Sequence, residues 1–188
     1  DRKKSLVLAT NPTARAAGVE PGMTAPQAVA RCPQLVIRAP HPGAENEARA
    51  ALLAIAFTLS PLIEDTAPGV CTADLKGLDP AKLEPACHAA VRELGALDLP
   101  ATAGIGRTPL LALYAARAGL PTIGNRQSAI GNPSPVLQVA DVAAFLAPLP
   151  LAAADPSAEL AGVLHGWGLR TLGDLTALPR DEIVRRFG

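Results

Sequence analysis

The stretch that most constrains this 188-residue chain runs from Gly104 to Pro121 and reads G-I-G-R-T-P-L-L-A-L-Y-A-A-R-A-G-L-P. An apolar run precedes it, and Thr108 then stands before a proline and an alanine-rich pattern, an order typical of a strand, a tight turn and a capped helix. Gly119 is typical of the end of that helix. Such a turn can aim backbone N–H groups at an anion, often with help from a lysine. No lysine follows Lys82, so this stretch lacks the cation that such a turn would use in a phosphate-binding enzyme.

Apolar residues make up 49% of the chain, enough for a buried core in one large or two small domains. Charges are balanced overall but unevenly distributed: residues 1–38 hold six basic and two acidic groups, and residues 39–98 hold four and nine. A dedicated nucleic-acid binder is usually more basic. Any contact with nucleic acid is therefore expected to use one face of the protein or further parts of it, and the alternative is solvated surfaces of mixed sign.

The cysteines, Cys32, Cys71 and Cys87, are odd in number and lack the spacing of metal ligands. The sequence contains neither a signal peptide nor an apolar run of about 20 residues. These features predict a cytoplasmic protein with reduced thiols. The three histidines are scattered, and neither a zinc site nor a catalytic role is expected for them.

The order of apolar patterns, caps and breakers predicts an α+β protein. Helices are expected after Thr24 and Thr108 and at residues 13–17, 45–59, 80–95, 141–146, 157–164 and 171–175. Strands are expected within residues 2–10 and at 35–38, 62–66, 69–75, 99–105 and 122–124, with a polar loop or hinge at 125–135. The middle of this order is that of an antiparallel βαββαβ-type sheet with helices.

The stretch from Gly104 to Pro121 resembles a motif of Y-family (translesion, UmuC/DinB-like) DNA polymerases, of the form G-I-(x)3-K-(x)3-K-(x)6-K-P. The glycine, the isoleucine and the final proline match without a gap, but the lysines fall on Pro109, Leu113 and Leu120. In the polymerases these lysines help to hold the incoming triphosphate and the DNA. A retained frame without charge is most similar to the ImuB branch, whose members are non-catalytic organisers of mutagenic repair.

A second block resembles the fingers of the same family. The spacing G-V-(x)2-G-M occurs at residues 18–23 and is followed by Cys32 and a proline. By this resemblance, Arg15 falls on a triphosphate-binding arginine, while the tyrosine that accompanies it is replaced by Pro12. The resemblance therefore implies that Arg15, together with Arg107 in the first block, is a vestige of a nucleotide site; the alternative for Arg15 is a solvated helix residue.

Active members of the family carry two neighbouring carboxylates on a palm strand, which bind two Mg²⁺ ions with an aspartate from the first palm strand. If Asp74 is matched to the later aspartate of that motif, the carboxylate pair falls on Gly69 and Val70, which cannot bind a metal. Glu64 and Asp65 lie about five residues too early and are expected to face away from the catalytic edge. No catalytic residue, metal site or cofactor is therefore expected, and Mg²⁺ would be the cofactor only of an active polymerase.

A third block matches a helix-hairpin-helix of the form h-G-h-G-h between helices expected at 159–164 and 171–175. Its glycines let backbone N–H groups face a DNA phosphate without reading sequence. The residues expected to contact DNA are Gly166, Gly168, Leu169, Arg170 and Thr171. The alternative is a purely structural helix hairpin. The run G-L-R-T-L-G-D-L also resembles the Y-family thumb, especially in ImuB-like sequences.

Together the blocks imply fingers at residues 1–40, a palm at 41–135 and a helix-hairpin-helix thumb at 136–188, without the first palm strand and the little finger. The implied function is that of a catalytically inactive ImuB-like adaptor in SOS-induced translesion synthesis and mutagenic DNA repair. Implied partners are DNA, a RecA-like ImuA protein, an error-prone replicative-type polymerase and the sliding clamp, in the bacterial cytoplasm at the nucleoid and without a membrane. The alternatives are an active Mg²⁺-dependent polymerase with its acids in another register, or a plain helix-hairpin-helix DNA-binding module.

Overall fold

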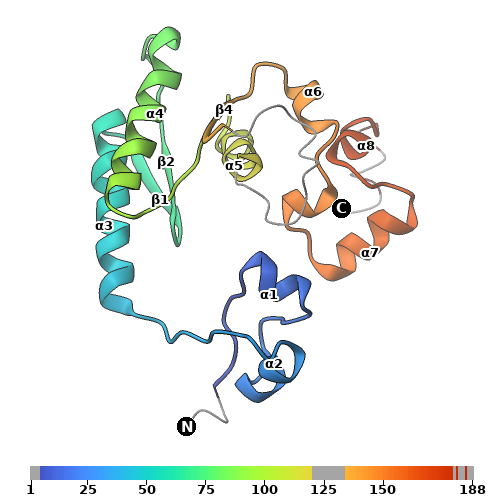
Figure 1. The fold of residues 1–188 in the computed structure, drawn as a ribbon. Helices are drawn as coiled ribbons and strands as arrows, with labels where there is room; N and C mark the ends of the chain where they lie inside the picture. Colours follow the sequence, from blue (N-terminus) through green and yellow to red (C-terminus); the bar gives the residue numbers. More distant parts are fainter. Residues whose placement is uncertain (1–4, 120–133, 180, 182–184, 186–188) are drawn as a thin grey trace. The chain divides into compact units, whose positions relative to one another are not determined.

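The computed structural model describes residues 5–119 and 134–179, together with residues 181 and 185, and Figure 1 shows its elements. The chain divides into two compact units, of which the first comprises residues 1–48 and 121–131 and the second residues 49–120 and 132–188. Helices alternate with short strands along the chain, and the predicted α+β fold class is confirmed. None of the described helices is long and apolar enough to span a bilayer.

The first unit contains two short, capped helices, α1 (Pro12–Ala16) and α2 (Ala25–Arg31). The side chain of Asn11 caps α1 by accepting the N–H of Ala14 at 2.8 Å. Thr24 caps α2 in a reciprocal capping box with Gln27, which satisfies backbone donors at the start of the helix. The small core of this unit includes Val19 and Ala28, both fully buried.

Two strands predicted in the first unit are wrong. Within residues 5–10, Leu6 forms an isolated bridge with Thr24, and backbone hydrogen bonds join Val7 to residues 22 and 23, but this contact does not extend into a strand; residues 35–38 form no strand either. Val36 and Ile37 are 75% and 53% exposed. An apolar run becomes a strand only where a second backbone supplies a ladder of hydrogen bonds. Among the described residues, the backbone hydrogen bond of this run is a local turn, from the N–H of Leu35 to the carbonyl of Cys32 at 3.0 Å. The strand predicted at 122–124 lies outside the described residues.

Helix α3 (Pro42–Leu59) begins in the first unit and ends in the second, where a hairpin of β1 (Ile63–Ala67) and β2 (Val70–Ala73) follows it. The two strands are antiparallel, as predicted. Ser60 joins the end of the helix to the hairpin: its buried hydroxyl donates to the carbonyl of Asp74 at 2.6 Å and accepts the N–H of Leu62. These two hydrogen bonds fix the position of the hairpin relative to the end of α3.

A second small sheet is built from β3 (Ala103–Ile105) and β4 (Val136–Gln138), which are parallel. Helix α4 (Pro80–Ala96) leads to β3, and α5 (Pro109–Ala118) follows it and packs against both strands (Figure 1). Strand β4 was not predicted, because three residues are too few to show a period in sequence. The described strands thus form two separate pairs rather than one continuous sheet.

The predicted strand, turn and capped helix around Gly104 are confirmed. Thr108 is the N-cap of α5, and its hydroxyl accepts the N–H of Leu111 at 3.2 Å. The glycine itself is required by packing, because a Cβ at Gly104 would overlap the backbone of Ala112 and Ala116 in α5. The absence of a side chain therefore sets how closely the helix lies on β3.

The remaining elements are α6 (Val142–Leu146), the 3₁₀ helix η1 (Leu151–Ala154), α7 (Ala158–Gly166) and α8 (Leu172–Thr176). They enclose a leucine core, namely Leu151, Leu164, Leu169 and Leu172. Tyr114 of α5 packs against this core, so these helices belong to the same compact unit as β3 and α5. The division into fingers, palm and thumb stays a prediction.

We expect Gly104→Ala to lower the stability of the chain by about 2–3 kcal/mol, because the added methyl group would overpack the contact between β3 and α5. The midpoint of urea denaturation measures this loss. Gly95→Ala is the matched control: Gly95 lies in α4, and nothing stands within 4 Å of a Cβ placed there. That control should gain about 0.5–1 kcal/mol of stability. Equal midpoints for the two variants would contradict the packing argument.

Candidate functional site

The positions matched to the carboxylate pair lie at the tip of the β1–β2 hairpin. Gly69 occupies the turn with a φ of +73°, and Val70 begins β2 opposite Ala67. Neither residue offers a metal ligand. Asp74, just after β2, accepts the N–H of Lys76 on its Oδ1 at 2.9 Å and so closes a local turn. The described geometry at these positions does not fit a pair of Mg²⁺ ions.

The nearby acids Glu64 and Asp65 are consecutive in β1 and therefore point to opposite faces of the hairpin. Asp65 forms an ion pair with Arg49 of α3, whose Nε donates to its Oδ2 at 2.5 Å. Glu64 stands opposite Thr72 in the strand register. Two carboxylates on opposite faces cannot share a metal ion, and one of them is already bound to a cation. Among the described residues no cluster of three or more His, Cys, Asp or Glu side chains could hold a metal.

The carboxylate of Asp65 acts electrostatically on the thiol of Cys71, its partner in the strand register of the hairpin. Burial is the main cause that raises the pKa of the Cys71 thiol, and the negative charge of Asp65 raises it further. Burial likewise raises the pKa of the Cys87 thiol in α4, with a smaller contribution from Glu84. Both thiols are therefore held in the protonated form, which is the less nucleophilic one.

The two arginines assigned to a vestigial nucleotide site, Arg15 and Arg107, are both exposed. Arg15 lies in the last turn of α1, in the first compact unit, whereas Arg107 lies in the turn before α5, in the second. In the described parts of the chain neither guanidinium forms an ion pair. No single described unit therefore contains both residues, and their nucleotide role stays a prediction.

Helices α7 and α8 lie where the sequence predicts the two helices of a helix-hairpin-helix, and residues 167–171 join them; the assignment of this motif stays a prediction. Gly168 has a φ of +83°, a conformation that glycine adopts without strain. The backbone N–H groups of the turn point back into α7: that of Trp167 donates to Val163, that of Gly168 to His165 and that of Leu169 to Leu164, at 3.0–3.1 Å. The turn is closed by the chain's own carbonyl groups.

Asp174 lies in the first turn of α8, and the sequence analysis did not predict a role for it. The N–H groups of Arg170 and Thr171 both donate to Oδ2 of Asp174 at 2.9 Å, and the N–H of Asp174 donates to the Thr171 hydroxyl at 3.0 Å. These backbone hydrogen bonds, first that of Arg170, lower the pKa of Asp174. The sequence did hold a signal, because threonine followed three residues later by an acid is the spacing of a capping box.

The guanidinium of Arg170 is also engaged within the hairpin. It donates to the carbonyl oxygens of His165 and Leu169 at 2.8 and 2.9 Å, and it thus caps the C-terminal end of α7. The five residues expected to contact DNA are brought together in space, but the backbone N–H groups of residues 167–171 and the Arg170 side chain already donate within the chain. A phosphate would have to exchange with these acceptors.

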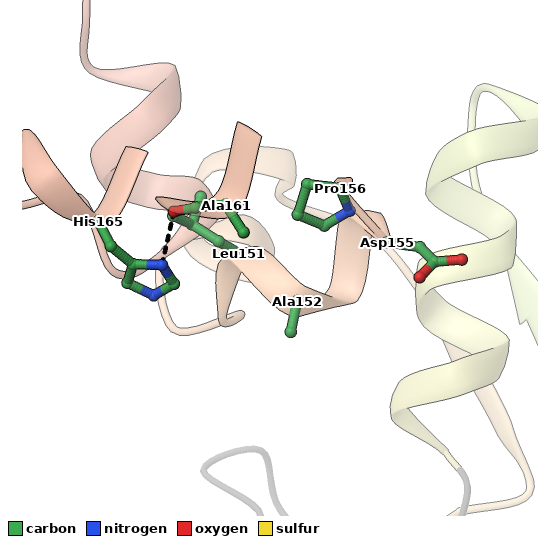
Figure 2. A pocket seen from close by; sticks show the side chains of 6 residues that line it. All are labelled: Leu151, Ala152, Asp155, Pro156, Ala161 and His165. Atoms are coloured by element: carbon green, nitrogen blue, oxygen red, sulfur yellow. Dashed lines mark hydrogen bonds between the residues drawn. The ribbon is translucent and has the colours of Figure 1, made fainter. Parts of the chain in front are cut away.

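A small pocket of about 150 Å³ lies beside this hairpin, and Figure 2 shows the six side chains that line it: Leu151, Ala152, Asp155, Pro156, Ala161 and His165. The ring Nδ1 of His165 donates to the carbonyl of Ala161 at 2.7 Å. Asp155 and His165 lie at opposite ends of the pocket in Figure 2. They form no acid–base pair, and the pocket has the features of a packing gap.

The protein has the fold of a Y-family DNA polymerase. Two solved structures share it: "Insertion ternary complex of Dbh DNA polymerase", with a TM-score of 0.74 and 17% identity, and "Crystal Structure of DinB from Sulfolobus solfataricus", with a TM-score of 0.72 and 19% identity. The alignments cover 97% and 96% of this chain, but 52% and 51% of those chains. At such low identity the likeness establishes the fold.

Residues 1–117 match the model of the IMS (impB/mucB/samB) family, and the chain belongs to that family. Among curated proteins it is similar to "DNA polymerase IV" of Pelotomaculum thermopropionicum, with 28% identity, and of Moorella thermoacetica, with 27% identity. The alignments cover 100% and 99% of this chain and 45% of each relative. The chain thus spans less than half the length of these relatives.

We expect the loss of the Asp174 charge to make the stability of the protein depend less on pH in acid solution. Because folding lowers the pKa of this carboxyl, its stabilisation is present above the unfolded-state pKa and is lost as the pH falls through the folded-state pKa. Asp174→Asn should therefore show a smaller decrease of Tm between pH 7 and pH 2.5. Asp155→Asn is the control, since the Asp155 carboxylate accepts no hydrogen bond from the described residues. A wild-type slope in Asp174→Asn would refute this assignment.

Proposed function

We propose that this chain belongs to a catalytically inactive, ImuB-like protein that acts as a DNA-binding adaptor in SOS-induced translesion synthesis and mutagenic DNA repair. The observation that carries the proposal is the hairpin tip. Where the resemblance places two metal-binding carboxylates, the chain has Gly69 in a left-handed turn and the apolar Val70. Phosphoryl transfer by two metal ions depends on such carboxylates.

The positions matched to triphosphate-binding lysines support the same proposal. Pro109 is the first residue of α5, and Leu113 is half-buried in that helix. Catalysis of nucleotidyl transfer consists largely of positioning the triphosphate and stabilising its charge with cations. Neither side chain can supply a cation to a phosphate, and the third matched position, Leu120, lies outside the described residues.

The proposed partners are DNA, a RecA-like ImuA protein, an error-prone replicative-type polymerase and the sliding clamp, with the protein located at the nucleoid of a bacterial cell. The names of the curated relatives, both DNA polymerases, support DNA as a partner. An adaptor of this kind would contribute a polymerase-shaped scaffold, and a partner polymerase would supply the chemistry. The family match over residues 1–117 argues for polymerase ancestry and against a plain helix-hairpin-helix module.

Primer extension tests the absence of catalysis. The full-length protein that contains this chain should add no nucleotide to a primed template above background in Mg²⁺ or Mn²⁺, because the matched positions lack both acids and cations. An active Y-family polymerase is the positive control. Robust incorporation that is abolished by Glu64→Gln or Asp65→Asn would overturn the proposal and establish the alternative, an active Mg²⁺-dependent polymerase with its acids in another register.

For DNA contact we propose the hairpin formed by Gly166, Gly168, Leu169, Arg170 and Thr171, binding the phosphate backbone weakly and without sequence preference. Its glycines leave open space beside the backbone, since nothing lies within 4 Å of a Cβ placed at Gly166 or Gly168. A phosphate at this turn could replace the carboxylate of Asp174 as acceptor of the Arg170 and Thr171 N–H groups. Binding of this kind weakens steeply with salt.

The variant Gly166→Asp, Gly168→Asp should bind duplex or primed DNA about tenfold more weakly, a change of about 1.4 kcal/mol, because two carboxylates would repel the phosphates. Fluorescence anisotropy at several salt concentrations measures the affinity. Gly166→Asp alone separates charge from backbone strain, since only Gly168 has a positive φ. Gly162→Asp, in the open middle of α7, is the control and should bind like wild type. Equal affinity in all variants would exclude the hairpin as the contact.

A further inference from the structure

The start of α3 is capped by a histidine. The N–H of Ala44 donates to the ring Nδ1 of His41 at 3.1 Å, and the backbone N–H of His41 donates to Oε1 of Glu45 at 3.2 Å. The N–H of Glu45 in turn donates to the His41 carbonyl at 3.0 Å. The imidazole lies over Gly43, with its Cε1 at 3.6 Å from a Cβ placed there. The arrangement is a variant of the capping box, with an imidazole nitrogen in place of the usual side-chain oxygen and with the returning acid one residue later than usual.

An imidazole can play this part only while it is neutral. Nδ1 accepts the N–H of Ala44 through its lone pair, so the proton of the ring is on Nε2; in the imidazolium form both nitrogens carry a proton and neither accepts. A positive charge at this place is also unfavourable next to the N-terminal end of the helix dipole. We propose that His41 is a pH-sensitive N-cap, closed when the ring is neutral and released when the ring is protonated.

The N-terminal end of α3 depends on this cap for its stability, because the residues around it are exposed. Residues 42–47 are all exposed and Ala48 is half-buried, so tertiary packing gives the first two turns little support and local capping must hold them. The boundary between the two compact units lies within α3, after Ala48. Protonation of His41 therefore frays the helical segment through which the chain passes from one unit to the other, and it leaves residues 49–59 helical.

Among the described residues, the charged side chain that contacts His41 is that of Glu45, on the same helix. Its carboxylate accepts the His41 backbone N–H, and after protonation it would attract the imidazolium towards itself and away from Ala44. Glu45 thus assists the release of the cap in acid. No other helix or strand of the described chain brings a charged side chain into a hydrogen bond or ion pair with His41.

Nuclear magnetic resonance of the whole chain tests the cap. In the wild type at pH 7.5, we expect the His41 ring to carry its proton on Nε2. Between pH 7.5 and 5.5, a range in which imidazoles change charge, the protection factors of the Ala44 and Glu45 amides should fall about fivefold after correction for intrinsic exchange. This corresponds to the loss of a cap worth about 1 kcal/mol.

Two variants make the test specific. His41→Asn should keep the cap at both pH values, because an asparagine side chain caps helices without titrating. His41→Ala should show the low protection at both. A ring proton on Nδ1 at neutral pH, or an equal decrease of protection in wild type and His41→Asn, would overturn the proposal. The amides of residues 52–58 serve as internal reference and should not respond.

Discussion

The second unit depends on one close contact, the approach of α5 to the backbone of β3 at Gly104. Because no side chain separates them, the helix backbone at Ala112 and Ala116 lies directly on the strand. The hydroxyl of Thr102 reinforces the contact by donating to the carbonyl of Ala116 at 2.8 Å. With α5 fixed in this way, Tyr114 reaches the leucine core of the C-terminal helices. The strand-turn-helix thus connects the small sheet with the hairpin motif.

Two acidic side chains of the described chain, those of Asp65 and Asp174, are bound by other groups of the protein. Arg49 holds Asp65 on one face of the β1–β2 hairpin, and Asp174 holds the first N–H groups of α8. Each of these acids therefore contributes to local structure. Acids that are engaged in this way stabilise a scaffold, and the role proposed for this protein is that of a scaffold.

Local hydrogen bonds explain why most helices begin where the sequence says. Thr24, Asp79, Thr108 and Ser157 each precede a helix and accept a backbone N–H two or three residues ahead. These caps depend on residues that are neighbours in sequence and can therefore be recognised without a structure. His41 performs the same task, but its ring is outside the usual set of capping residues, so only the folded structure reveals it.

The sequence by itself determined the α+β class, the helices, the antiparallel hairpin and the glycine turn before α5, because each follows from local patterns. The tertiary structure alone decided which strands exist, since residues 35–38 have no pairing partner among the described residues and the short β4 is paired with β3. It also decided that Asp65 forms an ion pair with Arg49, sixteen residues away, and that Asp174 accepts hydrogen bonds from the backbone N–H groups of Arg170 and Thr171. Pairing between distant backbones and between distant charges depends on how the chain folds back on itself, and that information is not contained in any one stretch of sequence.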